Sequence, residues 1–237
     1  MSDSLAQFIS ESLLTEKVIS GWHLDSFTNE LKRRIITAIC SNEVQQSFKK
    51  MGHVEFDVEA PENNSFSNIT HAYVTLGSID SGYSILAQYN YLKDETVPRE
   101  ELANIDIEIE IPQPFNPKIL NLLGGELVDA IRHELEHSSQ SSELLATSEI
   151  KKGPYSSLEE FESYLLSPAE IAAYTTGYMK KAKYYRADFV DTMKLELDAM
   201  LNSAIAAGLP KKGAQKIIRK AETQILSAAM KRYPQAF

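Results

Sequence analysis

The sequence contains one cysteine, Cys40, so no intrachain disulfide can form. That suits a reducing compartment, or a fold that is stable without cross-links. The chain also lacks an apolar run long enough to cross a membrane, and its first residues lack the basic region and apolar core of a secretory signal peptide. We therefore expect a protein that is not secreted through a signal peptide and makes no use of a membrane.

The chain also has fewer positively charged than negatively charged residues. The chain has 24 Lys and Arg residues against 33 Asp and Glu residues, for a formal net charge of −9. A surface of that sign repels the phosphate backbone, so we expect no general nucleic-acid binding. The 237 residues contain no repeat and no low-complexity segment, and the length suits one large domain or a domain with an appendage.

The first 50 residues have apolar side chains at helical spacing. A short helix is expected around Leu5, Phe8, Ile9 and Leu13. A second helix is expected to begin at Asp25 or Ser26, because both residue types cap helix N-termini. Its inner face is expected to comprise Phe27, Leu31, Ile35, Ala38 and Ile39.

The hydrophobic period changes to two between residues 53 and 111, which indicates β-strands. The clearest alternation is IDIEIEI at 105–111, with isoleucines on one side and carboxylates on the other. A hairpin turn at 78–82 is expected to join the second and third strands. The expected strands are 54–58, 69–76, 83–92 and 105–111. The sheet is expected to be mostly antiparallel.

Helical spacing returns after the prolines that follow the last strand. A helix is expected over 118–139, or from Gly124-Gly125, since glycine weakens a helix interior. Further helices are expected at 157–166, 168–183, 187–207 and 211–232. The last has a strongly basic face, which is either solvated or docks on an acidic partner. We expect an α+β protein with an N-terminal helical segment (1–50), a catalytic core (51–183) and a C-terminal helical pair (184–237) packed on that core.

The 118–139 helix contains His133-Glu134-Leu135-Glu136-His137, which matches H-E-x-x-H. Residues i and i+4 lie on one face of a helix, so the two imidazoles can bind one Zn²⁺. Glu134 lies beside them on the helical wheel, where a general base for an activated water belongs. The alternative interpretation is a solvated helix face that happens to carry two of the chain's five histidines.

A catalytic zinc needs a third protein ligand. The longer motif x-x-G-x-x-H after H-E-x-x-H would place that ligand at Glu143, but Gln140 stands where the glycine should be. Glu170 is the better candidate, at the start of a second helix. Ser167-Pro168-Ala169-Glu170 is also a good capping box, in which Glu170 would instead fold back on the amide of Ser167. Both interpretations of Glu170 stay open on sequence alone.

Two tyrosines follow Glu170 at one-turn intervals, Tyr174 and Tyr178. A phenol at either position can donate a hydrogen bond to a developing oxyanion. Tyr174 is the candidate catalytic tyrosine. Simple packing of both rings explains the pattern equally well.

Together, H-E-L-x-H and Y-x-x-x-P-x-E-x-x-A-Y resemble gluzincin-type zinc metallopeptidases, over about residues 105–180. The chain is most similar to small metallopeptidases often encoded by bacteriophages. The resemblance implies a zincin-like fold, a Zn²⁺ ion held by His133, His137 and Glu170, and Glu134 as the general base. It implies a peptide or protein substrate, and a place in the cytoplasm of a host cell or in association with a virion.

Two functions are weighed on this basis. The first is a zinc metalloendopeptidase that hydrolyses peptide bonds through an activated water. The second is a non-catalytic virion structural or interaction protein on a zincin-like scaffold, whose partner is a virion component or another protein. The intact Glu134 favours the enzyme, because a purely structural metal site has no need of a base.

Overall fold

The computed structural model describes residues 21–61, 69–91, 103–114, 116, 118–140 and 155–237. The first helix expected from the sequence, around Leu5 to Leu13, and the alternative ligand Glu143 lie outside these residues. The contacts within the chain define two compact units, which we call the sheet unit (Val18–Ser139) and the helical unit (Gln140–Phe237). Each unit has its own hydrophobic core.

The sheet unit is built on four strands in the order β1-β2-β4-β3. The strands are β1 (His53–Glu59), β2 (Ile69–Ile79), β3 (Ser84–Tyr91) and β4 (Ala103–Pro112). β1 pairs with β2 and β3 pairs with β4 in antiparallel fashion, whereas β2 and β4 are parallel. The alternation predicted for 105–111 is confirmed: the four isoleucines of β4 are fully buried, and the three acidic residues between them are exposed.

The predicted hairpin between the second and third strands is wrong. β2 and β3 are not neighbours, because β4 lies between them and pairs with both. β4 presents the most apolar inner face of the sheet, and the centre of a sheet buries such a face best. The turn residues at 78–82 correctly indicated that the chain reverses direction there. They did not indicate which strands pair with each other.

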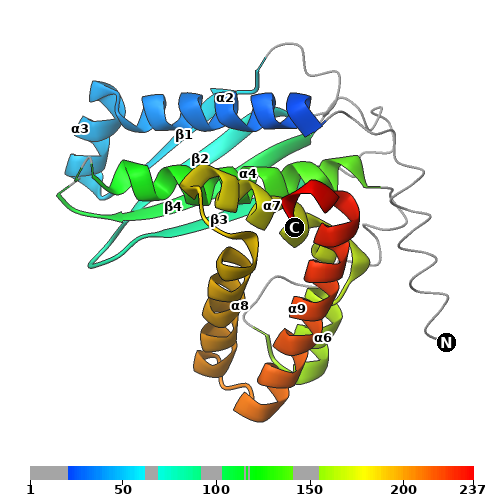
Figure 1. Cartoon of the computed structure of the whole chain (residues 1–237). Coiled ribbons are helices and arrows are strands. Elements are labelled where there is room, and N and C mark those ends of the chain that lie inside the picture. The colour runs from blue at the N-terminus through cyan, green and yellow to red at the C-terminus, as the bar shows by residue number, and fades with distance from the viewer. Residues whose placement is uncertain (1–20, 62–68, 92–102, 115, 117, 141–154) are drawn as a thin grey trace, which may run out of the picture. The chain divides into compact units, whose positions relative to one another are not determined.

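Helices cover one face of the sheet, as Figure 1 shows for α2 (Gly21–Ile39) and α4 (Ile119–Ser139). α2 contacts α4 and β1, and α4 contacts β3. α3 (Asn42–Met51) packs against β1 and is capped by the Ser41 side chain at its start and by Gly52 in the left-handed conformation at its end. The helices and the inner strand faces bury one apolar core, which includes Leu31, Phe48, Leu76, Ile107 and Leu127.

The expected cap at Asp25 or Ser26 is also wrong, since both residues lie inside α2. The buried side chain of Leu24 extends the apolar stripe of α2 by one turn beyond Phe27. Inside a helix, the packing of such a stripe outweighs the local preference of Asp and Ser for a cap.

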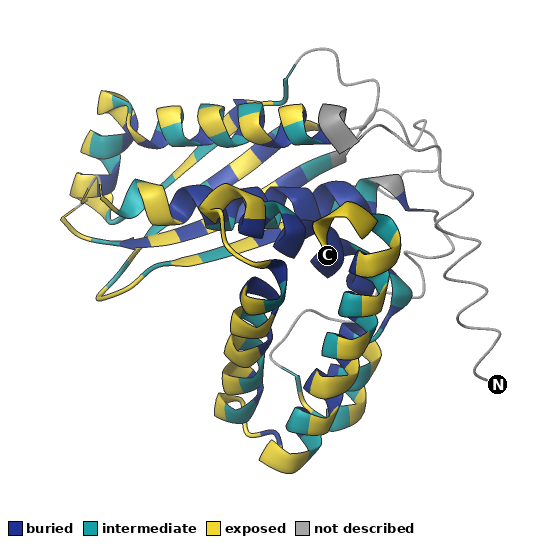
Figure 2. Cartoon of the chain, in the orientation of Figure 1, coloured by how far each residue is buried: buried dark blue, intermediate teal, exposed yellow. Residues whose placement is uncertain are grey.

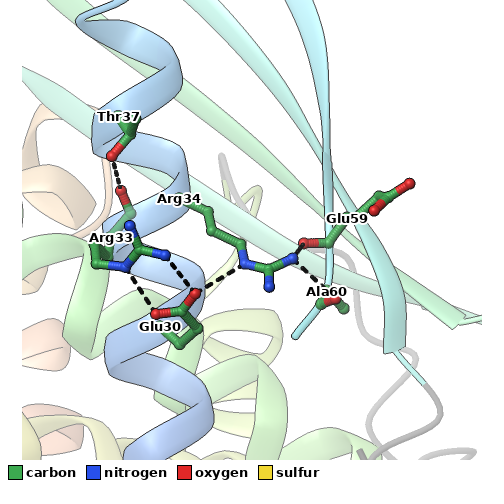
Figure 3. Close-up of polar contacts among 6 residues, drawn as sticks. All are labelled: Glu30, Arg33, Arg34, Thr37, Glu59 and Ala60. Carbon is green, nitrogen blue, oxygen red and sulfur yellow. Dashed lines mark hydrogen bonds and ion pairs between the residues drawn. The ribbon is translucent and has the colours of Figure 1, made fainter. Parts of the chain in front are cut away.

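Polar contacts fasten α2 to the end of β1 (Figure 3). Glu30 accepts hydrogen bonds from Arg33 at 2.7 and 2.8 Å and from Arg34 at 3.0 Å. Arg34 also donates to the carbonyl oxygens of Glu59 at 3.1 Å and Ala60 at 3.4 Å. The hydrogen bonds from Arg33, and then those from Arg34, lower the pKa of Glu30 to about 2. One carboxylate therefore orients the guanidinium that joins helix and strand.

The helical unit comprises α6 (Leu158–Leu165), α7 (Pro168–Tyr185), α8 (Phe189–Ala206) and α9 (Lys211–Arg232), followed by the short 3-10 helix η1 (Pro234–Ala236). α9 contacts each of the other three α-helices. Figure 2 shows the result on α8 and α9, which alternate between buried and exposed residues along their length. The four helices agree closely with those expected at 157–166, 168–183, 187–207 and 211–232.

The structure is thus an α+β protein with a helical C-terminal part, as the sequence predicted. Sequence periodicity placed boundaries near residues 50 and 183, whereas the contacts divide the chain between Ser139 and Gln140. The difference arises because α2 and α3 share the core of the sheet, and α6 and α7 share the core of α8 and α9. Among the described helices, none has both the length and the apolar character needed to span a membrane.

Candidate metal-binding site

The motif lies on α4, which begins at Ile119 and continues through Gly124 and Gly125 to Ser139. The buried residues Leu127, Ile131 and Leu135 recur every four positions and hold the helix against the apolar core. Every residue from Ile131 to His137 is buried, and Figure 2 shows this stretch of α4 in dark blue. The tertiary packing along α4 explains why the two glycines do not end the helix.

The two histidines of the motif face each other one turn apart. The Nε2 atoms of His133 and His137 are 3.2 Å apart, and the rings meet edge to face with an interplanar angle of 77°. His133 is 8% exposed and His137 is 5% exposed. The interpretation of this turn as a solvated helix face is therefore wrong.

The separation of the two nitrogens fits a shared zinc ion. Two Zn–N bonds of about 2.0–2.1 Å at a tetrahedral angle place their nitrogens about 3.3–3.4 Å apart. The observed 3.2 Å is close to that value. The same separation also fits an N–H···N hydrogen bond between two neutral imidazoles. The geometry of the pair is thus compatible with metal binding and does not require it.

Glu134 is held by a strand of the sheet. Its Oε2 accepts a hydrogen bond of 2.7 Å from the backbone amide of Tyr89 on β3, and the residue is 2% exposed. β3 forms one edge of the described sheet and pairs only with β4 there. A carboxylate has about four acceptor sites, so one amide does not exhaust its capacity to take a proton. The hydrogen bond fixes the side chain of the candidate base against β3.

A buried ion pair occupies the neighbouring face of the same turn. Arg132 donates to Glu136 at 3.3 Å, and both side chains are almost completely buried. Breaking such a pair by removing one partner is costly, because it leaves an uncompensated buried charge. The pair therefore helps to keep this part of α4 helical and fixed around the histidines. Sequence reasoning assigned neither residue a role, although their i, i+4 spacing was visible.

The third candidate ligand, Glu170, lies in the first turn of α7 in the helical unit. It is 3% exposed, and its backbone amide donates to the Ser167 side chain at 3.2 Å. The amide of Ser167, which a capping-box glutamate would accept from, donates to the carbonyl of Tyr164 at 3.1 Å. Ser167 therefore caps α7 as predicted, while its own amide already has an acceptor other than Glu170. This arrangement favours a different role for the Glu170 carboxylate.

The two candidate tyrosines are both buried in the helical unit. The Tyr174 hydroxyl donates to the Tyr164 hydroxyl at 3.3 Å, and the Tyr178 hydroxyl approaches the sulfur of Met200 at 4.0 Å. Burial raises the pKa of Tyr164 well above its usual value, and Tyr174 and the negative charge of Glu170 add to the rise. Tyr164 thus stays protonated beside Glu170. Sequence reasoning included Tyr164 in the motif but gave it no role.

His133, His137 and Glu170 are all buried and each offers a ligand atom that could hold a metal ion. Within the sheet unit, the structure brings the rings of the two histidines together and, in a separate contact, pairs Glu134 with the amide of Tyr89. Sequence reasoning missed the Tyr89 amide, because a backbone donor carries no signal in residue identity. Comparison with known proteins adds no relative: no protein-family model, curated protein or solved structure matches the chain.

Proposed function

We propose that the protein is a zinc metallopeptidase with a zincin-like catalytic core. The observation that carries the proposal is the His133–His137 pair on a buried helix, with Nε2 atoms 3.2 Å apart and Glu134 in the same turn. Buried polar side chains are costly unless they are bound to something. A bound metal ion offsets that cost for the two imidazoles.

In this proposal, His133 and His137 hold zinc through their Nε2 atoms and Glu170 supplies a carboxylate oxygen as the third protein ligand. Three protein ligands leave a fourth position open for water or substrate, as in catalytic zinc sites. A zinc ion held by these residues would supply a Lewis acid that activates water and polarises a carbonyl. The donor set, two imidazoles and one carboxylate, is one that catalytic zinc sites use.

Glu134 acts as the proton carrier. Its carboxylate takes a proton from the attacking water and returns it to the leaving amine of the peptide, which breaks the C–N bond. The amide of Tyr89 holds one carboxylate oxygen in place during both transfers. Burial of this turn limits the access of bulk water, which strengthens the electrostatic interactions within the site. Tyr174 is the proposed donor to the oxyanion; its single hydroxyl proton, which is directed at the Tyr164 hydroxyl 3.3 Å away, would turn from Tyr164 to the oxyanion.

The test measures zinc content and peptide hydrolysis on the same preparation. Wild type should contain about one zinc per chain by elemental analysis and should cleave an unfolded protein such as casein or a mixed peptide library. Glu134→Gln should keep the zinc and lose about 10²–10⁴-fold in activity, because an amide cannot accept the proton. The glutamine side chain of this variant retains a carbonyl oxygen for the Tyr89 amide, so the fold should be preserved.

Glu108→Gln is the matched control, since it makes the same chemical change on the exposed face of β4 and should leave activity unchanged. Equal activity in wild type and Glu134→Gln would remove Glu134 from the mechanism. Zinc binding without hydrolysis of any peptide would replace the enzyme with the non-catalytic alternative. A purified protein that binds no zinc would remove the enzyme and leave the non-catalytic alternative.

A further inference from the structure

The face of the sheet opposite the helices is acidic along β1 and β4. The four strands contain six acidic residues and no Lys or Arg. All six are exposed, and we call them the acidic face: Glu55, Asp57, Glu59, Asp106, Glu108 and Glu110. Asp and Glu are poor strand formers, and like charges on one face of a sheet repel each other. Repulsion between these carboxylates therefore destabilises the sheet on this side.

The strand register sorts the acidic face into two rows. Glu55 and Asp57 lie on β1, and their partners Thr75 and Tyr73 on β2 pair in turn with Glu108 and Asp106 on β4. With about 4.8 Å between strands, the rows lie about 10 Å apart on either side of β2. Tyr73, which is 47% exposed, lies between them. A helix is about 10–12 Å across with its side chains, so the two rows can flank one helix laid along β2.

Local contacts relieve only part of this charge. Ser84 donates to Glu110 at 2.8 Å, Asn90 donates to Asp106, and the His71 ring lies 3.8 Å from Asp57. None of these partners is a lysine or an arginine. The whole segment 18–139 has 19 Asp and Glu residues against 9 Lys and Arg residues. A partner for this face is expected to be cationic.

The helical unit presents a surface of the opposite sign. Segment 140–237 has 14 Lys and Arg residues against 11 Asp and Glu residues. Lys212, Lys216 and Arg219 lie at i, i+4 and i+7 on α9, so they share one face, and all three are exposed. Within the described residues, none of the three forms an ion pair, whereas the neighbouring Lys220 pairs with Glu162. All four cations are exposed on α9.

We propose that the acidic face binds the basic face of α9 from a second copy of the chain. The dimensions agree: Lys212 to Arg219 spans about 10 Å along a helix, and Asp106 to Glu110 spans about 13 Å along a strand. Flexible lysine side chains accommodate the difference. Each copy carries both surfaces, so the contact is head to tail, and unlike a two-fold dimer it can propagate or close into a ring. The contact is independent of zinc and of catalysis.

The test is sedimentation velocity at two ionic strengths. The Debye length falls from about 30 Å at 0.01 M to about 3 Å at 1 M, so the wild type should self-associate at low salt and weaken at least about tenfold at high salt. Two variants remove one surface each. K216E/R219E changes α9, and E55K/E108K changes both rows of the acidic face. Each variant alone should remain monomeric at low salt.

An equimolar mixture of the two variants should restore a single contact. The first variant keeps its acidic face and the second keeps its basic helix, so the mixture should associate although neither variant does alone. With E55Q/E108Q in place of E55K/E108K, no charge-swapped second contact can form, and the mixture should stop at a 1:1 heterodimer. K49E/K50E on α3 is the control, since it changes the net charge as K216E/R219E does and should associate like wild type. Circular dichroism verifies folding, and E55Q/E108Q replaces the lysine variant if that variant fails to fold.

Three results would overturn the proposal. The first is a wild type that stays monomeric at about 0.5 mM protein, far above the micromolar range of specific association, at low salt. The second is association that persists in both charge-reversal variants. The third is a mixture that fails to pair while the wild type associates. If the wild type stays monomeric but binds a synthetic peptide of residues 211–232, the acidic face recognises a basic helix, and a second folded copy is not its occupant.

Discussion

The backbone amide of Tyr89 donates a 2.7 Å hydrogen bond to the carboxylate of Glu134. The bond joins the motif helix α4 to the edge strand β3, so the position of the candidate base is set by the packing of a helix on a sheet. The two histidines are set by the helix alone, because their spacing is four residues. The proposed site therefore depends on the integrity of the sheet unit as well as on the motif.

We expect His133→Ala/His137→Ala to abolish zinc binding, because it removes both imidazole ligands, while alanine, a strong helix former, preserves the helix. Zinc content by elemental analysis of the purified variant measures this. His53→Ala/His71→Ala is the matched control, since it removes two imidazoles outside the motif, one exposed on β1 and one half-buried on β2. Full zinc retention in the first double variant would place the metal elsewhere.

Removal of zinc should lower the melting temperature of the wild type. A ligand bound only to the native state stabilises it by about 4 kcal/mol at a concentration 1,000 times its Kd. Thermal unfolding with and without a chelator such as EDTA, followed by circular dichroism, measures the shift. The melting temperature of His133→Ala/His137→Ala should not respond to the chelator. An unchanged wild-type transition after verified metal removal would contradict a ligand role in folding.

The sequence predicted strands and helices correctly where the apolar residues recur with one clear period. The alternation of isoleucines and acidic residues in β4 is the clearest example. The sequence did not predict which strands pair. The hairpin expected between β2 and β3 does not form, because β4 lies between these two strands and pairs with both. At the site, the histidine spacing implied a shared face and the structure has it. The Tyr89 amide and the acceptor of the Ser167 amide required the three-dimensional structure, because backbone groups are identical in every residue.

The Glu30–arginine contacts predict a pH dependence. Hydrogen bonds from Arg33 and Arg34 lower the pKa of Glu30 from 4.5 to about 2 in the folded state. A lowered pKa contributes stability that is fully present above about pH 4.5 and is lost as the pH falls toward 2. Because the pair is partly exposed, the contribution should be below about 1 kcal/mol. Denaturant unfolding should show Glu30→Gln to be less stable than wild type at pH 7, with the difference vanishing near pH 2. A constant difference across that range would rule out the titration of Glu30 as its cause.

The last prediction separates the two roles of the 167–170 turn. Ser167 caps α7 through its side chain, so Ser167→Ala should cost about 0.5–2 kcal/mol of stability and leave zinc bound. Ser157→Ala is the matched control, because Ser157 caps α6 in the same way, at 3.1 Å from the amide of Glu160. Glu170→Ala should instead lose zinc. Removing a ligand should weaken affinity well beyond the roughly 10–100-fold that outer-shell changes cause. Competition with a chromogenic zinc chelator measures the affinity, and denaturant unfolding of the zinc-free proteins measures the stability. If Glu170→Ala binds zinc like the wild type, Glu170 is not a ligand, and Glu143→Ala becomes the variant that should lose the metal.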